Sequence, residues 1–199
     1  LDEDKYYFDQ DGKMLTGEQK IGVKKCVFSE DGVLESSEGG VDPDAPMVAL
    51  TFDDGPGKYR PGLLDLLDKY NVKVSFFVTN THPDYQNLIA EEAKRGHTVA
   101  IHSASHKYDQ IYTSEQAYFG DLEQMNSIIK AQTGNDASIM RFPGGSSNTI
   151  SKDYCPGIMT QLVNDVTARG LLYCDWNVSS GDANSKPIST EQVVQNVIS

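Results

Sequence analysis

Two short segments of the chain carry residue types that bind catalytic metals, and the first is MVALTFDDGP at residues 47–56. An apolar run leads there into Asp53 and Asp54, which predicts a buried strand that ends at two adjacent carboxylates. Gly55 and Pro56 would bend the backbone so that both carboxylates face one site. Because adjacent carboxylates repel each other, they suggest a compensating cation, although a solvated acidic turn would give the same residues.

The second segment is HSASH at residues 102–106. If these residues form a helical turn, His102 and His106 share one face and lie close enough to bind one metal ion. Two surface histidines would give the same spacing, so this pattern is weak by itself. Two histidines and an aspartate, however, are a standard ligand set for a catalytic zinc ion with open coordination positions.

Four ordered motifs within residues 47–199 resemble those of the polysaccharide deacetylases, the NodB-homology domain of carbohydrate esterase family 4. They are TFDDGP at residues 51–56, HSxxH at 102–106, RFPGG at 141–145 and DW at 175–176. Chance is a poor explanation for four motifs in this order. The family's fifth motif, a Leu-x-His that supplies the general acid, has no counterpart, since no histidine follows the DW motif.

The resemblance implies roles for the residues of the first three motifs. Asp54, His102 and His106 would bind one divalent ion, with zinc as the first choice and Co²⁺, Ni²⁺ or Mn²⁺ as alternatives. Asp53 would be the general base that takes a proton from water. Arg141 would pair with Asp53 and hold its carboxylate in place, the alternative being an ordinary surface ion pair.

Substrate contacts are implied for the third and fourth motifs, at Pro143, Gly144, Gly145 and Trp176. Gly144 stands where the family usually has tyrosine, so the backbone N–H remains as an oxyanion donor while a pocket wall is lost. Trp176 is interpreted as a wall near the acetyl methyl group, with a core tryptophan as the equal alternative. Asp175 would orient the acid histidine, and without that histidine it is expected to have no partner.

Composition excludes several classes of protein. The net charge of −12 argues against a nucleic-acid partner and against adsorption to an anionic membrane. No apolar run approaches the roughly 20 residues of a membrane span. Three cysteines without CxxC spacing indicate neither a zinc–thiolate site nor a disulfide framework, and Cys174 is expected to be buried. Without an initiator methionine or signal peptide, the chain is expected to be a processed or trimmed form.

The first forty residues contain a repeat with a period of 20, since KYYFDQDG at residues 5–12 recurs as KCVFSEDG at 25–32. Each unit is an apolar strand followed by an Asp-Gly turn, which predicts β-hairpins. The first unit resembles the cell-wall-binding repeats of Gram-positive surface proteins, which bind choline or glucans through aromatic cages. We therefore expect wall-binding-like hairpins at 1–37, a linker at 38–46 and an extracellular or wall-associated protein. A hairpin that only caps the catalytic domain is the equal alternative.

From residue 47 onward, predicted strands and helices alternate. Strands are expected at 48–52, 72–79, 98–102, 139–142 and 171–176, and helices at 63–70, 85–95, 114–132, 158–169 and 190–198. Such alternation predicts an α/β fold with a parallel sheet or barrel. The resemblance implies a distorted (β/α) barrel with the motifs at the carboxyl ends of the strands. The last strand, which would carry the fifth motif, is missing, so we expect a truncated chain that is impaired on amide substrates.

The leading functional hypothesis is a metal-dependent de-N-acetylase, a hydrolase of linear amides in cell-surface polysaccharide. N-Acetylglucosamine in peptidoglycan is the first choice of substrate, because a wall-binding repeat would tether the domain to that polymer. A chitin-type deacetylase and an acetyl xylan esterase remain alternatives. A carbohydrate-binding wall protein with an inactive deacetylase domain is the alternative of another class. A zinc protease is set aside because no HExxH motif is present.

Overall fold

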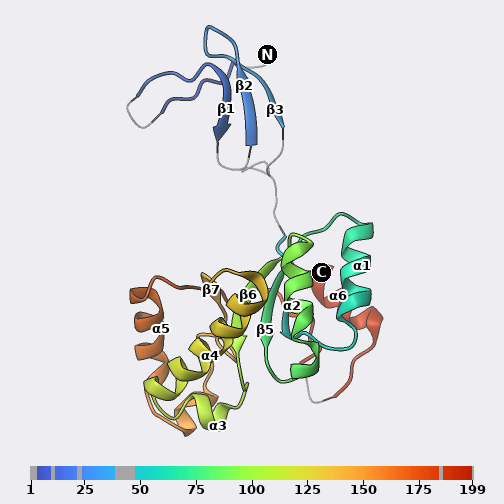
Figure 1. Ribbon diagram of the computed structural model, residues 1–199, viewed down its shortest axis with the longest axis vertical. Coiled ribbons are helices and arrows are strands. Elements are labelled where there is room, and N and C mark those ends of the chain that lie inside the picture. The colour runs from blue at the N-terminus through green and yellow to red at the C-terminus, as the bar shows by residue number, and fades with distance from the viewer. Residues whose placement is uncertain (1–3, 10–11, 22–23, 39–47, 184–185, 199) are drawn as a thin grey trace. The chain divides into compact units, whose positions relative to one another are not determined.

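Two units make up the chain, Leu1–Val48 and Ala49–Ser199, in this computed structural model (Figure 1). The structure describes residues 4–9, 12–21, 24–38, 48–183 and 186–198. The predicted linker at 38–46 begins inside a strand, because Glu38 is still paired, and the rest of that segment lies outside the described residues. Wall binding by residues 1–37 and a linker role for residues 38–46 therefore stay predictions.

The N-terminal unit contains a three-stranded antiparallel sheet in the order β1-β2-β3. Its strands are β1 (Gly17–Ile21), β2 (Lys24–Phe28) and β3 (Leu34–Glu38). Cys26 and Phe28 of the central strand are buried, and the ring of Tyr7 packs against Phe28 with 5.7 Å between centroids. Tyr6, Tyr7 and Phe8 are all exposed, and Phe8 is the most exposed of the three. The unit thus has a small core and leaves aromatic rings at its surface.

The period of 20 in the sequence is also a period in the backbone hydrogen bonds. The amide of Asp9 donates to the carbonyl of Lys13, and the amide of Ser29 donates to that of Val33, both at 2.9 Å. The amide of Gly12 closes the first turn onto the Asp9 carbonyl at 3.0 Å, and the glycine twenty residues later makes the same bond at the same distance. Both glycines have a positive φ, which Asp-Gly turns require. The two predicted hairpin turns are therefore equivalent in structure.

The second unit is built on a five-stranded sheet in the order β4-β5-β6-β7-β8, in which every neighbouring pair is parallel. The strands are β4 (Thr51–Gly55), β5 (Ser75–Thr79), β6 (Thr98–Ser103), β7 (Ile139–Met140) and β8 (Leu172–Tyr173). Each parallel connection needs a crossover, and helices supply it. The predicted α/β class is confirmed, and the curved parallel sheet is consistent with a distorted barrel.

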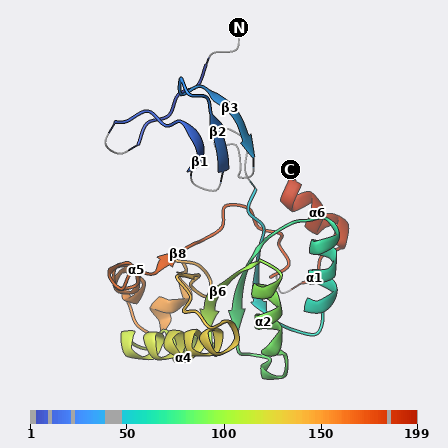
Figure 2. The same cartoon turned by 45° about the horizontal axis from the view of Figure 1, so that its top comes forward.

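Five longer helices accompany the sheet: α1 (Arg60–Lys69), α2 (Asn87–Lys94), α4 (Glu115–Thr133), α5 (Ile158–Ala168) and α6 (Thr190–Ile198). The prediction missed three short elements, α3 (Tyr108–Ile111) and the 3₁₀ turns η1 (Pro83–Tyr85) and η2 (Ile150–Asp153). Helices α2 and α4 pack on β6 and on each other (Figure 2). Helix α4 has clear end signals, because the Ser114 side chain accepts the Ala117 N–H and Gly134 adopts a left-handed φ of 80°.

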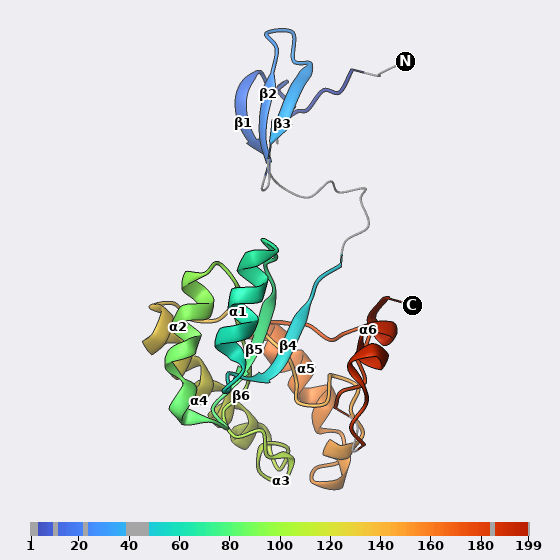
Figure 3. The same ribbon diagram turned by 90° about the vertical axis from the view of Figure 1, so that its right-hand side faces the viewer.

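The core of this unit lies between the sheet and its helices. Strand β5 runs beside β4, with helix α1 alongside (Figure 3), and its Phe76, Phe77 and Val78 are almost fully buried. Phe76 and Val78 share one core cluster with Leu64, Leu67, Ile89, Ile101, Leu122, Met125, Ile129, Met140, Leu162 and Val166, whereas Phe77 lies against the guanidinium of Arg141. This packing fixes the strand ends that carry the motifs. Among the described residues, no helix has the length and apolar character needed to cross a membrane.

Candidate active site

A β-bulge brings the two adjacent aspartates to one site. In the register of β4 with β5, Asp53 pairs with Phe77 and Gly55 already pairs with Val78, so Asp54 is an extra residue. Its φ of 65° lies in the left-handed region, which aspartate tolerates better than most residues. Adjacent side chains of a regular strand point to opposite faces, and the bulge removes that alternation. The bend was expected at Gly55 and Pro56, whereas the bulge begins one residue earlier, at Asp54.

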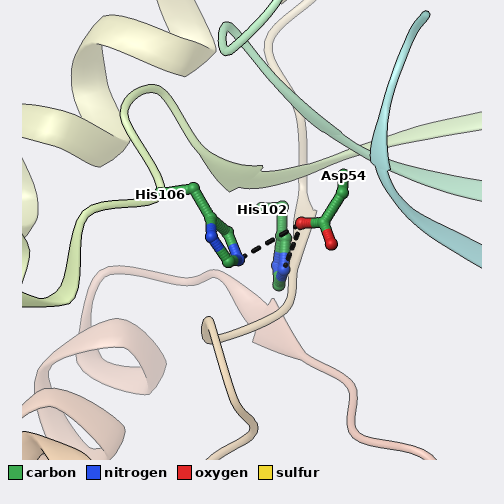
Figure 4. A group of neighbouring side chains, drawn as sticks. All are labelled: Asp54, His102 and His106. Carbon is green, nitrogen blue, oxygen red and sulfur yellow. Dashed lines mark ion pairs between the residues drawn. The ribbon is translucent and has the colours of Figure 1, made fainter. Parts of the chain in front are cut away.

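The two histidines come from a strand end and a loop, so the strand expected at 98–102 is confirmed and the helical turn considered for residues 102–106 does not form. His102 belongs to β6, while His106 follows in a loop with a left-handed φ of 54°. Their rings are nevertheless 5.0 Å apart between centroids. Figure 4 shows both imidazoles facing the carboxylate of Asp54, which enters from β4. The strand ends therefore assemble the trio that sequence spacing suggested, by a different local geometry.

The spacing of the trio fits one small divalent ion. Oδ1 of Asp54 lies 3.5 Å from Nε2 of His102 and 3.2 Å from Nε2 of His106. The three ligand atoms all lie within 4.8 Å of one another. Ligand atoms about 2.1 Å from a tetrahedral zinc ion would be separated by about 3.4 Å. Asp54 is largely exposed, so this side of the group is open to solvent and to a substrate.

His102 is held in the tautomer that a metal ligand needs. Its Nδ1 lies 2.9 Å from the carbonyl oxygen of Arg141, which only accepts hydrogen bonds. Nδ1 therefore carries the proton and Nε2 presents its lone pair to Asp54. Burial lowers the pKa of His102, against the opposing charges of Asp53 and Asp54. The neutral imidazole is thus favoured, and this is the form that binds metals.

One carboxylate that the motifs do not contain fixes the loop between the histidines. Asp121 of α4 accepts the hydroxyl of Ser103 at 2.6 Å and the backbone N–H groups of Ala104 and Ser105 at 2.8 Å each. The Ser103 hydroxyl oxygen accepts in turn from the N–H of His106 at 2.8 Å. The left-handed turn at His106 is therefore tied to a helix. No sequence signal marked Asp121, because it lies in the middle of an ordinary amphipathic helix.

Arg141 is a buried clamp on the first aspartate, and the surface ion pair considered above is excluded because only 2% of Arg141 is exposed. Its Nη1 donates to Oδ1 of Asp53 at 2.7 Å and to the hydroxyl of Thr51 at 2.9 Å. Its Nε donates to the Cys174 carbonyl at 2.8 Å, and the guanidinium lies 4.0 Å above the Phe77 ring. Cys174 itself is exposed, contrary to prediction, because it directly follows β8, the edge strand of the sheet.

Asp175 has a partner, which corrects the expectation that it would have none. The backbone N–H of Ser146 donates to its Oδ1 at 3.0 Å, and the Ser146 hydroxyl makes a short hydrogen bond to its Oδ2. Trp176 is 46% exposed, so the core alternative for it is wrong. Its ring lies against Gly145, where an added Cβ would come within 3.3 Å, and 5.5 Å from the Arg141 guanidinium. The fourth motif thus packs on the third.

A buried tyrosine stabilises the turn of the third motif through a hydrogen bond to its backbone. The hydroxyl of Tyr112 donates to the carbonyl of Pro143 at 2.7 Å. Gly144 and Gly145 follow with φ values of 78° and 84°, which glycine adopts without strain. All substrate-contact candidates therefore lie on one supported turn or on the tryptophan packed against it.

A second buried cation supports the turn after the aspartates. The guanidinium of Arg60 lies 3.9 Å above the Phe76 ring, and a Cβ on Gly55 would fall 1.7 Å from its Nη2. Its Nε lies 3.0 Å from a carboxylate oxygen of Glu92, so the two side chains form an ion pair. Neither carboxylate oxygen of Glu92 has a hydrogen-bond partner among the described residues. Burial raises the pKa of Glu92 to about 7, although Arg60 opposes the shift. Because a Cβ at position 55 would overlap the Arg60 guanidinium where it now lies, only glycine fits there.

A pocket of about 260 Å³ opens beside the two aspartates. Its lining includes Asp53, Asp54, Leu63, Tyr59 and His82. Tyr59 is 78% exposed, so its ring is accessible to a bound sugar. The carboxylates are therefore reached from a surface that has room for a neighbouring part of a substrate.

Comparison with known proteins agrees with this geometry. A profile described as polysaccharide deacetylase matches residues 40–155, more than half of the chain. The chain belongs to the polysaccharide deacetylase family. A peptidoglycan-N-acetylglucosamine deacetylase of Bacillus cereus is 31% identical to this chain. The match covers 75% of this chain and 53% of the Bacillus cereus protein. The peptidoglycan-N-acetylglucosamine deacetylase PgdA of Listeria monocytogenes is 38% identical to this chain. The match covers 68% of this chain and 26% of PgdA.

A solved structure shares both sequence and fold with this family member. It is the catalytic domain of a peptidoglycan N-acetylglucosamine deacetylase from Eubacterium rectale, with 88% identity and a TM-score of 0.78. The match covers 79% of this chain and 72% of that one. The chain spans about half the length of the first curated relatives that it matches, 53% and 45%. What these proteins act on bears on the present chain only as a proposal.

Proposed function

We propose that the chain carries the catalytic domain of a metal-dependent hydrolase that removes acetyl groups from N-acetylglucosamine in peptidoglycan. The observation that carries this proposal is the trio Asp54, His102 and His106 next to a second carboxylate, Asp53, which a buried arginine holds. The names of the relatives from Bacillus cereus, Listeria monocytogenes and Eubacterium rectale support the substrate. Zinc is the proposed ion, because two imidazoles and one carboxylate suit it.

A divalent ion bound by the trio would polarise the acetyl oxygen and lower the pKa of a bound water. Asp53 would take the proton of the attacking water. Its Oδ1 is occupied by Arg141, whereas Oδ2 accepts no hydrogen bond from any residue that the structure describes and is free to receive the proton. Arg141 orients this carboxylate, and the burial of Arg141 prevents its guanidinium from turning toward solvent.

The turn of the third motif would receive the acetyl group. The backbone N–H of Gly144 is the proposed donor to the oxygen that becomes negative when water adds to the carbonyl carbon. Trp176 would cover the methyl group, since its exposed ring lies on Gly145 and near Arg141. Asp175 would support this wall by holding Ser146 in the same turn.

The alternative of an inactive wall-binding protein is not favoured by the site. A chain that had lost catalysis would have no reason to keep the base, its arginine clamp and the metal trio in working geometry. Acetyl xylan esterase and chitin-type activity use the same chemistry, and one relative is a bifunctional xylanase/deacetylase that is 30% identical. The experiment must therefore separate an amide from an ester.

We expect the zinc-loaded protein to release acetate and an equal amount of free amine from purified peptidoglycan, at a low rate, because no histidine follows the DW motif to protonate the leaving amine. The measurement is acetate by enzymatic assay and amine by fluorescent labelling, in parallel on peptidoglycan, an N-acetylglucosamine oligomer and acetylated xylan. The same protein with Asp54→Ala, loaded in the same way, is the matched control. Acetate from xylan alone, or no acetate from any of the three polymers, would contradict the proposal.

For the N-terminal unit we propose a targeting role on the cell wall, outside the membrane. The support is the repeated hairpin turn together with the exposed rings of Tyr6 and Phe8 next to the packed Tyr7. Exposed aromatic rings are the groups that stack on sugars or enclose a choline cation. This unit has its own sheet and shares none of the catalytic motifs.

Deletion of residues 1–37 is expected to leave hydrolysis of a soluble acetylated substrate nearly unchanged and to weaken retention on cell walls. Retention is measured by sedimentation with purified walls, and a Tyr6→Ser, Phe8→Ser variant tests the rings without removing the unit. Because both rings are exposed, this variant keeps the buried Cys26 and Phe28. Equal retention of the intact and the deleted protein would refute the targeting role.

A further inference from the structure

The space beside Gly144 is filled by a residue that no motif contains. A Cβ placed on Gly144 would lie 2.7 Å from the hydroxyl oxygen of Tyr108 and 3.4 Å from its ring carbon Cε1. A side chain at position 144 and the present position of the Tyr108 ring therefore exclude each other. The glycine that removes a pocket wall from the third motif makes room for the tyrosine that begins α3.

Aromatic neighbours fix the ring of Tyr108 in this place. It lies edge-on to the imidazole of His106, with 5.7 Å between centroids and 78° between planes. It also packs edge-on against Tyr112 at 5.5 Å. Tyr112 is fully buried and donates to the carbonyl of Pro143. The Tyr108 ring is thus held between the proposed metal ligands and the turn of the third motif.

The hydroxyl of Tyr108 has no hydrogen-bond partner within the part of the chain that the structure describes, although the residue is half-buried. A tyrosine hydroxyl has an ordinary pKa of about 10 and is a donor at neutral pH. Half-buried donors are normally satisfied by protein, water or a ligand. Here the hydroxyl sits at Gly144, whose backbone N–H is the proposed oxyanion donor.

We infer that Tyr108 is a further catalytic residue, whose hydroxyl donates a hydrogen bond to the acetyl oxygen of the substrate beside the N–H of Gly144. This inference rests on the proposed function. The hydroxyl keeps its proton throughout, and no bond to it forms or breaks. Its hydrogen bond strengthens as negative charge develops on the oxygen, because charged acceptors bind donors more strongly than neutral ones.

Tyr108→Phe removes only the hydroxyl and keeps the ring that packs on His106 and Tyr112. We expect kcat for 4-nitrophenyl acetate to fall by about a hundredfold, as for the loss of one oxyanion donor. This substrate has a leaving group that needs no proton, so the assay isolates the addition step. KM and the zinc dissociation constant, measured by competition with a chromogenic chelator, should stay unchanged. Tyr70→Phe, at an exposed tyrosine that ends α1, is the matched control.

A kcat of Tyr108→Phe within twofold of the wild type would overturn the inference, and so would a rise in KM with kcat unchanged. Loss of zinc affinity in the variant would also overturn it, because the ring would then act through His106. Zinc-dependent hydrolysis of the aryl acetate without release of acetate from any N-acetylated glycan would contradict the proposed function alone. Absence of zinc-dependent hydrolysis of the aryl acetate by the wild type would overturn both.

Discussion

Asp53→Asn is expected to retain its metal ion and to lose at least about a hundredfold in turnover, the usual effect of removing a general base. The amide oxygen of asparagine still accepts the hydrogen bond from Arg141 that Oδ1 of Asp53 accepts at 2.7 Å. The amide nitrogen that replaces Oδ2 takes up no proton. The geometry is therefore preserved while the proposed chemistry is lost. Metal content by mass spectrometry and acetate release on the same samples give the two quantities.

Asp84→Asn is the matched control for this variant, because Asp84 is an exposed aspartate in η1. It should behave as the wild type in both measurements. If Asp53→Asn instead lost the metal while the rate per bound metal stayed constant, the roles of Asp53 and Asp54 would be reversed. The distance from Asp54 to both histidines makes the assigned roles the expected ones.

His102→Ala and His106→Ala are each expected to reduce metal content to background and to abolish hydrolysis. Each removes one of three donor atoms that lie within 4.8 Å of one another, and two remaining ligands hold zinc weakly. His82→Ala is the matched control for metal content alone, since His82 is exposed and belongs to no motif but lines the pocket beside the aspartates. Full metal occupancy in both single variants would exclude this site.

The two histidine variants should differ in stability, which separates a ligand role from a packing role. His102 is buried and bonded to the Arg141 carbonyl, so its removal leaves a cavity and an unpaired acceptor. His106 is about a quarter exposed and leaves the smaller defect. His106→Ala should thus unfold near the temperature of the metal-free wild type, whereas His102→Ala should unfold at a lower temperature.

The proposed ligands and the base could be predicted from sequence because the motifs name them, but their local geometry could not. Asp53 and Asp54 were expected directly after a strand at 48–52 and lie within β4 itself, which carries a bulge there. The bulge depends on how β4 pairs with β5, which no local pattern in TFDDGP reveals. His102 was expected at the end of a strand and lies in β6, whereas the helical turn considered for residues 102–106 does not form. The loop that carries His106 depends instead on hydrogen bonds to Asp121, fifteen or more positions away.

Elements were predicted well where periodicity and end signals agreed. Helix α4 was expected at 114–132 and spans Glu115–Thr133, with a serine cap and a glycine at its ends. The strand expected at 171–176 is only Leu172–Tyr173, since both residues are exposed at a sheet edge and little packing extends it. Tyr108 was missed because the start of α3 and the turn at Gly144 lie side by side in the fold but far apart in sequence.

The most direct test of the account is a crystal structure of the zinc-loaded protein with anomalous data collected at the zinc absorption edge. We predict one strong anomalous peak about 2.0–2.2 Å from Oδ1 of Asp54 and from Nε2 of His102 and His106. Asp53 should remain on Arg141, outside the coordination sphere. A peak elsewhere, or a zinc ion that binds Asp53 in place of Asp54, would contradict the account.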